Sequence, residues 1–319
     1  MDILWAGGLI GVENKAGPDW PRQNKKINLM KIKRLIFLAV VLACATVFAS
    51  PGQKAAETGN SPHHVSLYDR VMKSGKIRAA YTVYPPGCFK DESGKLKGVF
   101  VETLEEAAKN LGLTVEWTEE VGRAAQIEGL ENDRYDMIGS AVWANPERAK
   151  LATLSSPLYY SPFYIYARKD DPKFNENIRV TALNSPDVSI AMVAGSTAEA
   201  IVKDQFPNAT RVALPRMTDH GVFFLDATNN KADIIIMEKS QALKLLESDP
   251  GKIVNIKPNA PLRVIGNCYM FKRNEIEFQN MLNSEINDLL TSGFVERQLE
   301  KYEQYPNSQL RIAPPYWQD

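Results

Sequence analysis

The segment DMIGSAVWANPER, residues 136–148, decides the fold of this chain. Its first seven residues form a short apolar run that is typical of a β-strand. Its last residues are typical of a helix start: Asn145 suits the N-cap, Pro146 the first helical position, and Glu147 the positive end of the helix dipole. A strand that leads straight into a helix presents polar groups at the carboxyl edge of a sheet, where open α/β sheets bind ligands.

Arg148 lies one turn into this expected helix. Its side chain can reach back over the sheet edge, and its planar guanidinium suits a carboxylate. Most arginines are instead exposed to solvent, so a solvated position on the helix is the alternative for Arg148 taken by itself. The choice between a carboxylate-binding and a solvated Arg148 depends on the sequence of the rest of the chain.

Strand patterns and helix patterns alternate along most of the chain. Before the quoted segment, strands are expected at residues 76–83 and 113–118, and helices at 102–111 and 124–131. A stretch rich in proline and aromatic residues, at 155–168, is expected to be a first extended crossing. After it, strands are expected at 188–193, 211–214 and 232–237, and helices at 198–206 and 221–229. A second extended crossing is expected at 263–272, followed by two last helices at 275–292 and 294–305. This alternation predicts a mainly parallel sheet with helices on both faces.

The amino-terminal residues have the layout of a secretory signal peptide. A basic segment at 30–34 precedes an apolar run at 35–48 that is short for a membrane span, and small residues place a cleavage site after Ala49. We therefore assign 1–29 to a mis-assigned upstream segment, 30–49 to the signal peptide and 50–64 to a disordered tether, and we expect a periplasmic mature protein. The alternatives are an amino-terminal membrane anchor and a lipoprotein cut at Cys44.

Composition argues against some classes of partner and chemistry. With 38 basic and 38 acidic residues, the charge balance gives no reason to expect nucleic acid as a partner. The adjacent His63 and His64 lack convergent ligands for a metal, and we expect no cofactor. Cys88 and Cys268 remain after removal of the signal peptide, so a disulfide and two free thiols are both open alternatives in an oxidising compartment.

Short motifs follow one another in an order that points to a family. They are Tyr84-Pro85-Pro86, GKLKGV at 94–99, Tyr135-Asp136, PERA at 146–149, SSPLY at 155–159, GST at 195–197, Ala232-Asp233 and SGF at 292–294. Each motif is weak alone. The ordered set, over about residues 65–306, resembles the bacterial extracellular solute-binding proteins of family 3, the amino-acid-binding group that serves ABC importers.

The resemblance implies the type II fold of periplasmic binding proteins, in which two α/β lobes are joined by two crossing strands and the ligand lies in a cleft between them. We expect lobe 1 at 65–164 and 266–319, and lobe 2 at 165–265. The resemblance also implies that a monomer captures a small carboxylate ligand, an amino acid or a relative of one, by hinge closure and delivers it to an ABC permease.

By this resemblance, Arg148 binds the ligand carboxylate, and the turn formed by Gly195, Ser196 and Thr197 adds to the site from the other lobe. A tight glycine turn after a strand leads here into a helix N-terminus, whose free N–H groups attract anions. Plain N-capping is the alternative for Ser196 and Thr197. Glu238 stands where the family usually has the aspartate that holds the ligand ammonium.

Four further residues are candidates for contact with the ligand. Tyr84 and Phe89 are candidate aromatic walls, with core packing as the alternative. Trp143 stands where the family often has a serine or threonine, and it offers a flat aromatic face in place of a hydroxyl, while Ser140 remains as a small polar residue. Because a tryptophan replaces the usual hydroxyl residue at position 143, the identity of the ligand stays open.

An enzyme on the same fold is the alternative function. Cyclohexadienyl dehydratases resemble these binding proteins and use a carboxylic acid in the cleft as general acid, a role that Glu238 can take if burial raises its pKa. The sequence has no recognisable nucleophile–His–Asp set or metal cluster, and His220 stands alone. We therefore expect a binding protein and not an enzyme.

Overall fold

The computed structural model describes residues 65–215, 218 and 220–312. The expected upstream segment, signal peptide and tether, at 1–64, lie outside these residues, as do the last residues of the expected lobe 1, at 313–319. The described residues belong to one compact unit. No helix among them is both long and apolar enough to cross a membrane.

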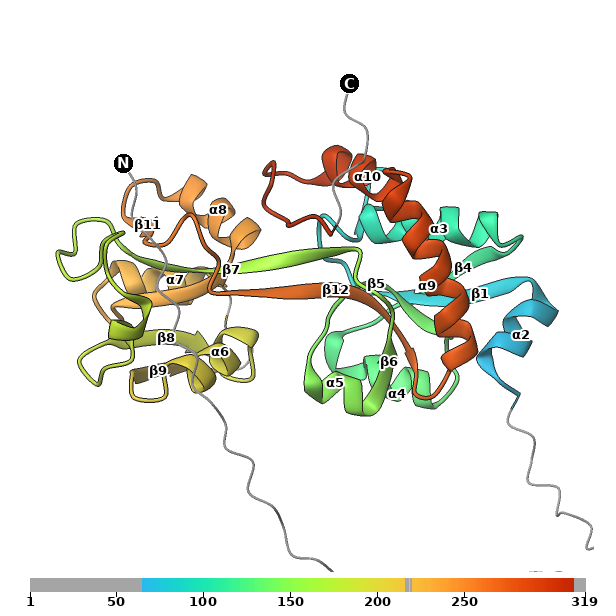
Figure 1. Cartoon of the computed structure of the whole chain (residues 1–319), viewed down its shortest axis with the longest axis horizontal. Helices are drawn as coiled ribbons and strands as arrows, with labels where there is room; N and C mark the ends of the chain where they lie inside the picture. Colours follow the sequence, from blue (N-terminus) through green and yellow to red (C-terminus); the bar gives the residue numbers. More distant parts are fainter. Residues whose placement is uncertain (1–64, 216–217, 219, 313–319) are drawn as a thin grey trace, which may run out of the picture. The chain divides into compact units, whose positions relative to one another are not determined.

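A ten-stranded sheet organises the described residues (Figure 1). Its main path has the order β4-β1-β5-β12-β7-β10-β8-β9, while β6 pairs with β12 and β11 pairs with β7. The strand bounds are β1 Lys76–Tyr81, β4 Thr114–Glu120, β5 Met137–Trp143, β6 Ala152–Leu154, β7 Tyr159–Arg168, β8 Ser189–Val193, β9 Thr210–Leu214, β10 Ile234–Glu238, β11 Ile253–Asn255 and β12 Arg263–Lys272. A separate two-stranded sheet joins β2 Phe89–Lys90 to β3 Leu96–Lys97.

Parallel pairing is confined to the two outer parts of the main sheet. Strand β1 pairs in parallel with β4 and β5, and β8 pairs in parallel with β9 and β10. Strands β12 and β7 run antiparallel to each other and to the outer strands beside them. We call β4, β1 and β5 the β1 side, and β10, β8 and β9 the β8 side. The expected parallel sheet is therefore present within each side, and the antiparallel centre corresponds to the two extended crossings.

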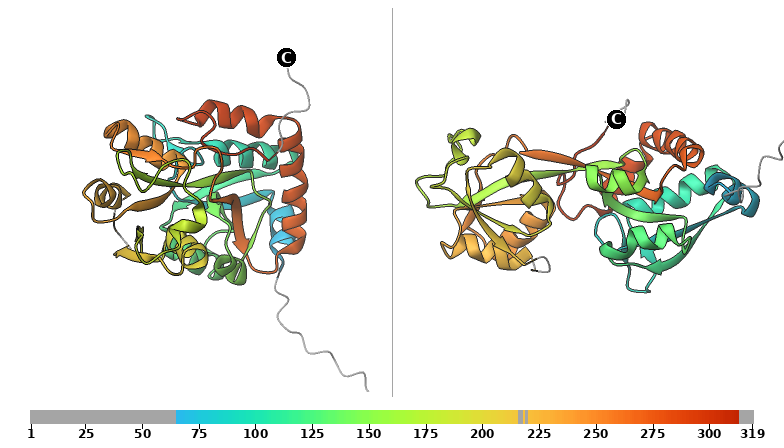
Figure 2. Two further views of the ribbon diagram at one scale, coloured as in Figure 1. Left: turned by 60° about the vertical axis from the view of Figure 1, so that its left-hand side comes forward. Right: turned by 90° about the horizontal axis from the view of Figure 1, so that it is seen from below.

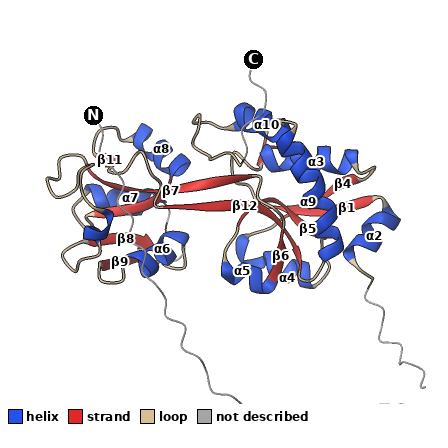
Figure 3. Cartoon of the chain, viewed as in Figure 1, coloured by secondary structure: helices blue, strands red, loops and turns tan. Residues whose placement is uncertain are grey.

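Helices cover both faces of each side (Figures 2 and 3). Their bounds are α2 Leu67–Ser74, α3 Val99–Asn110, α4 Gln126–Glu131, α5 Pro146–Leu151, α6 Thr197–Gln205, α7 His220–Thr228, α8 Lys239–Ser248, α9 Ile276–Thr291 and α10 Phe294–Tyr302, with short 3₁₀ turns η1 Arg123–Ala125 and η2 Val180–Leu183. On the β1 side, α3, α9 and α10 form one hydrophobic core with the strands, and α4 lies over a second core. On the β8 side, α6 packs into one core, and α7 and α8 pack into the other.

Most of the expected elements are present, but their ends differ and two helices were not expected. Helix α10 ends at Tyr302, three residues before the expected end, and α3 begins at Val99, three residues before the expected start. Neither α2 nor α8 is among the expected elements. Helix α8 begins at Lys239, directly after β10 ends at Glu238, so no turn residue marks the change from strand to helix.

Strands β7 and β12 run side by side through the centre of the sheet (Figure 1). Each has ten residues, and they pair over Tyr159–Phe163 and Arg263–Asn267. Beyond this shared stretch, β12 continues along β5 and β7 continues along β10. The two strands therefore belong to both sides, as expected for the crossing strands.

The residues after α10, at 303–312, form a further connection between the β1 side and the β8 side. We call these residues the tail. The backbones of Leu310 and Tyr160 exchange two hydrogen bonds, of 2.8 and 2.9 Å, so that the tail lies along β7. The side-chain amide of Gln309 donates to Glu238, at the end of β10, over 3.0 Å. The buried carboxylate of Glu303 accepts a hydrogen bond from the Gln309 N–H and thereby fixes the start of the tail. The tail thus joins α10 to the end of β10.

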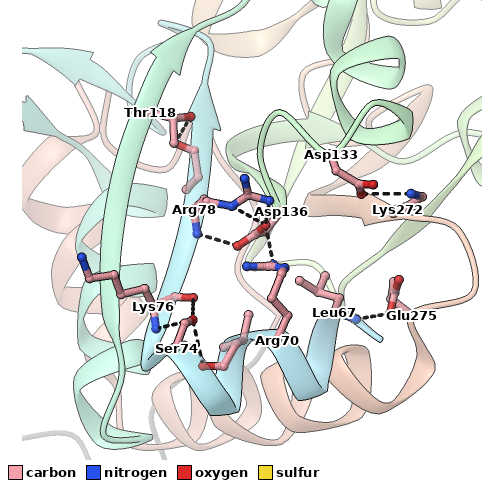
Figure 4. A network of polar contacts seen from close by, with 12 residues as sticks. Leu67, Arg70, Ser74, Lys76, Arg78, Thr118, Asp133, Asp136, Lys272 and Glu275 are labelled. Carbon is pink, nitrogen blue, oxygen red and sulfur yellow. Dashed lines mark hydrogen bonds and ion pairs between the residues drawn. The ribbon is translucent and has the colours of Figure 1, made fainter. Parts of the chain in front are cut away.

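Asp136 fixes β5 against β1, one residue before β5 begins (Figure 4). Its carboxylate is buried and accepts a hydrogen bond of 2.7 Å from the Arg78 N–H and two more, of 2.7 and 2.9 Å, from the Arg78 guanidinium. It also forms an ion pair with Arg70 of α2. One carboxylate therefore ties together β1, β5 and α2.

Asp136→Ala should lower the free energy of unfolding by about 3 kcal/mol, because two arginines lose the buried carboxylate that they share. Urea denaturation followed by circular dichroism measures the change. The control is Lys272→Met, which removes an ion pair of 2.9 Å with an Asp133 side chain that is 68% exposed. Since exposed pairs contribute about 1 kcal/mol or less, equal losses in the two variants would contradict the assigned role of Asp136.

Cys88 and Cys268 are free thiols, and both are buried. The disulfide that an oxidising compartment would allow is therefore absent, and the free-thiol alternative holds. Burial raises the pKa of both thiols to about 12, and for Cys88 the Glu120 carboxylate adds to this effect. The thiolate is the reactive form of cysteine, so both side chains are protected by burial and by protonation.

Neither Cys88 nor Cys268 should react with a water-soluble maleimide at pH 8 in the folded protein, and both should react in 6 M guanidinium chloride, which exposes them. Peptide mass spectrometry after labelling identifies the modified residues. Rapid labelling of either cysteine under native conditions would show that the thiol is accessible and would contradict this prediction.

Candidate functional site

Strand β5 ends at Trp143 and α5 begins at Pro146, as the quoted segment predicts. Asn145 caps the helix, because its side-chain oxygen accepts a hydrogen bond of 2.8 Å from the Arg148 N–H. The Arg148 guanidinium turns back toward the strand and donates to the Trp143 carbonyl over 2.8 Å. Arg148 is therefore half-buried over the carboxyl end of β5, and the fully solvated alternative does not apply.

Arg148 lines a pocket at the carboxyl edge of the β1 side, which we call the arginine pocket. Its lining consists of Thr82, Tyr84, Arg123, Gln126, Ala141, Val142, Trp143 and Arg148. The parallel pairing explains this grouping, because the carboxyl ends of β4, β1 and β5 meet at the same edge of the sheet. Segments that are distant in sequence, namely η1 after β4, the loop after β1, and α5 after β5, therefore converge there.

Among the described residues, the lining of the arginine pocket includes two guanidinium groups and no carboxylate. The Arg123 guanidinium lies over the Tyr84 ring, 5.4 Å from its centroid. Within residues 65–215, 218 and 220–312, neither Arg123 nor Arg148 takes part in an ion pair. Burial and the positive charge of Arg123 lower the pKa of Arg148, while Glu147 opposes them. The pocket is thus a region of uncompensated positive charge.

Trp143 separates the arginine pocket from a second hollow, which we call the helix-end hollow. The lining of this hollow is Trp143, Phe163, Val193, Ser196, Thr197, Ala198, Ile236, Met237, Glu238 and Gln241. The Trp143 ring makes edge contacts with Tyr84, at 6.0 Å between centroids, and with Phe163, at 5.3 Å. The pocket and the hollow have only about 30 and about 40 Å³ of free space. A ligand that contacts both must therefore displace the Trp143 side chain.

The predicted turn at Gly195, Ser196 and Thr197 forms the start of α6. Gly195 has a φ of +74°, in the left-handed region that glycine adopts readily. The Ser196 hydroxyl accepts a hydrogen bond from the Glu199 N–H, and the Glu199 carboxylate accepts one of 2.8 Å from the Gly195 N–H. The Ser196 side chain is thus the N-cap of α6, so the capping alternative for Ser196 is realised. Ser196 and Thr197 also line the helix-end hollow, and a ligand contact is compatible with capping.

Glu238 is buried, and its carboxylate already has three hydrogen-bond donors. It caps α8 by accepting from the Ser240 hydroxyl at 2.6 Å and from the Gln241 N–H at 3.1 Å, and it accepts from Gln309 of the tail at 3.0 Å. Burial raises the pKa of Glu238, and these hydrogen bonds oppose the rise. The predicted contact with a ligand ammonium would have to compete with these donors.

The other three candidates lie in different surroundings. Tyr84 lines the arginine pocket, and its hydroxyl accepts a hydrogen bond from the Gln241 side chain. Ser140 is buried inside the β1 side, where its hydroxyl accepts a hydrogen bond of 2.9 Å from the Thr82 N–H. Phe89 belongs to neither hollow and packs edge-on against Tyr302, at 5.5 Å between centroids. The structure therefore brings Tyr84, but neither Ser140 nor Phe89, to the lining that contains Arg148.

Two residues of this region are absent from the sequence-based expectations. Arg123 follows β4 as Arg148 follows β5, and both strands pair in parallel with β1, which lies between them, so the two residues lie at one edge of the sheet. That signal becomes visible only when the strand order is known. Gln309 reaches Glu238 across 71 residues of sequence, a contact that has no local pattern.

Glu238→Gln should raise the free energy of unfolding relative to wild type, and the difference should grow as the pH rises above about 4.3, the ordinary pKa of glutamate. Because the raised pKa means that the folded state holds the Glu238 proton more tightly than the unfolded chain does, ionisation with rising pH favours unfolding. The amide oxygen of glutamine can still accept the capping hydrogen bonds.

Urea denaturation at pH 4 and pH 8 measures this difference for Glu238→Gln and for a control, Glu247→Gln. Glu247 is an exposed glutamate at the end of α8, whose carboxylate accepts a hydrogen bond from the Tyr305 hydroxyl. A stability difference for Glu238→Gln that shrinks from pH 4 to pH 8 would show that ionised Glu238 stabilises the fold, contrary to the prediction.

Comparison with known proteins places the chain among extracellular binding proteins. The family model described as "Bacterial extracellular solute-binding proteins, family 3" matches residues 77–305. The "Probable amino-acid ABC transporter-binding protein" of Haemophilus influenzae is 31% identical over 141 residues, which are 44% of this chain and 51% of that protein. The "Probable histidine-binding protein" of Campylobacter jejuni is 26% identical over 224 residues, which are 69% of this chain and 81% of that protein.

Solved structures agree with the architecture. The crystal structure of the ancestral amino acid-binding protein AncCDT-1, a precursor of cyclohexadienyl dehydratase, matches with a TM-score of 0.56 and 24% identity, over 74% of this chain and 99% of that one. This likeness shows the fold alone. The predicted type II fold of periplasmic binding proteins, with two crossing strands, is thereby confirmed.

Proposed function

We propose that this chain, which belongs to the family 3 bacterial extracellular solute-binding proteins, binds an amino acid or a related small carboxylate and delivers it to an ABC permease. The relatives described above are binding proteins whose names refer to amino acids and to ABC transport. The proposed place of action is the periplasm, and the proposed form is a monomer.

The position and surroundings of Arg148 are the observation that carries this proposal. Arg148 is half-buried at the edge of a parallel sheet, forms no ion pair among the described residues, and lies one side chain, Trp143, away from the hollow at the start of α6. Partial burial of a guanidinium without an ion-pair partner carries a desolvation cost, and a ligand carboxylate would supply the opposite charge. The free N–H groups at the start of α6 favour an anion from the opposite direction.

In this proposal, the β1 side and the β8 side act as the two lobes, with the boundaries expected from sequence at 164/165 and 265/266. The ligand binds in the arginine pocket and the helix-end hollow after the Trp143 ring has moved. Closure then takes place by bending of β7 and β12, the two strands that both sides share.

The dehydratase-like alternative gives Glu238 the role of general acid. Such an acid has to reach its substrate with its proton, whereas both oxygens of Glu238 accept hydrogen bonds from the protein. We therefore propose binding without catalysis. Turnover of prephenate or arogenate by the purified protein, abolished in Glu238→Gln, would favour the enzyme instead.

Arg148→Ala should weaken ligand binding by several kcal/mol, the usual cost of removing one partner from a buried charge pair. A thermal-shift screen of amino acids and small carboxylates first identifies a ligand, since a molecule that binds only the folded state raises its stability. Calorimetry with that ligand then compares wild type, Arg148→Ala and the control Lys150→Ala.

Lys150 is an exposed cation on the same helix, outside the arginine pocket. Its replacement by alanine should leave the affinity unchanged. If Arg148→Ala folds and binds the ligand as tightly as wild type does, Arg148 is not the carboxylate site and the proposal loses its main support.

A further inference from the structure

The arginine pocket has a second cation that the family resemblance does not assign. Arg123 opens η1, three residues after the end of β4, and β4 lies beside β1 in the sheet. The β1–β4 register runs to the pair Tyr81 and Glu120, so η1 starts at the same edge as the loop after β1. Arg123 and Arg148 therefore approach one pocket from two separate strand ends.

Arg123 is exposed, and it forms no ion pair with any of the residues that the structure describes. Its contact with the Tyr84 ring is a cation–π interaction, which stabilises a cation without cancelling its charge. None of the described residues that line the arginine pocket carries a carboxylate. The two guanidinium groups are also close enough for Arg123 to lower the pKa of Arg148. Two like charges that share a pocket without a counter-ion are suited to a ligand with more than one negative charge.

The negative groups nearby are already in use by the protein. Glu238 lines the helix-end hollow and accepts three hydrogen bonds, two of which cap α8. Glu199, at the start of α6, accepts from the Gly195 N–H and pairs with Lys203 at 2.9 Å. Glu147, beside Arg148 in α5, is exposed and acts on the pKa of Arg148, but it lines neither the arginine pocket nor the helix-end hollow. The described lining of the two sites therefore offers a ligand two guanidinium groups, and its one carboxylate, Glu238, already has three donors.

We infer that the ligand is a small dicarboxylate, whose first carboxylate binds Arg148 and whose second binds Arg123. An acidic amino acid and a dicarboxylate without an amino group share this chemistry. The inference rests on the proposed function and narrows its ligand class. Arg123 is the specificity-determining residue, because it distinguishes a second carboxylate from the neutral amide or the cation that other amino acids present in its place.

The test is calorimetry of the purified protein with L-glutamate, L-aspartate, succinate, L-glutamine, L-lysine and L-histidine. L-glutamate should bind about 10- to 100-fold more tightly than L-glutamine, the range expected for hydrogen bonds between charged groups. L-lysine and L-histidine should bind most weakly. The affinity for a dicarboxylate should also fall with added salt more steeply than the affinity for L-glutamine.

Arg123→Gln should bring the affinity for L-glutamate down to about that for L-glutamine and leave the affinity for L-glutamine within about threefold of wild type. The matched control is Arg134→Gln. The Arg134 guanidinium also lies over a tyrosine, 5.9 Å from the ring centroid of Tyr135, but it lines neither the arginine pocket nor the helix-end hollow. Arg134→Gln should leave all affinities unchanged.

The outcomes separate this inference from the proposed function. If L-lysine, L-histidine or L-glutamine binds at least as tightly as L-glutamate and Arg123→Gln has no effect, the dicarboxylate inference is overturned and the amino-acid-binding function stands. If succinate binds through both arginines and the amino acids do not, the inference stands and the function moves to a simple dicarboxylate. If wild type binds no member of the panel, the dicarboxylate inference is overturned, and the proposed function is decided by the wider thermal-shift screen of amino acids and small carboxylates.

Discussion

The carboxylate of Asp136 is the contact on which the geometry of the site depends. It holds the N–H and the guanidinium of Arg78 in β1 and the side chain of Arg70 in α2, and so sets how β5 lies against β1. Four residues further along β5, the Ser140 hydroxyl makes a second contact with the β1 side by accepting a hydrogen bond from the Thr82 N–H. Strand β5 therefore delivers Trp143 and α5 to a defined place at the sheet edge, and Arg148 follows from that placement.

The site combines two surfaces of different origin. The arginine pocket is built from the ends of three adjacent parallel strands, and its charge comes from side chains. The helix-end hollow is built around the start of α6, and its attraction for anions comes from backbone N–H groups. Trp143 lies between them, in edge contact with Tyr84 and Phe163. If the proposed ligand binds across both surfaces, its entry depends on the position of this one aromatic ring.

Local patterns were enough to predict most of the fold, because they act within a few residues. Asn145 and Pro146 mark the start of α5, and alternating apolar runs mark the parallel strands. The prediction missed features that have no local signal: α8 follows β10 without a turn, and the cap that Glu238 provides for this helix was not foreseen. Arg123 was missed because its relation to Arg148 depends on strand order, and Gln309 because its partner is 71 residues away.

The place of the tail in the chain has a consequence for the order in which the protein can be assembled. The cores of the β8 side draw on residues between β7 and β12 and, apart from the edge contact of Trp143, are complete once that stretch has been synthesised. The main core of the β1 side needs β12, α9 and α10, which are synthesised after β11. Synthesis of the β1 side therefore starts before that of the β8 side, but its core is completed later. Among the described residues, the contact between Gln309 and Glu238 is one of the last to form.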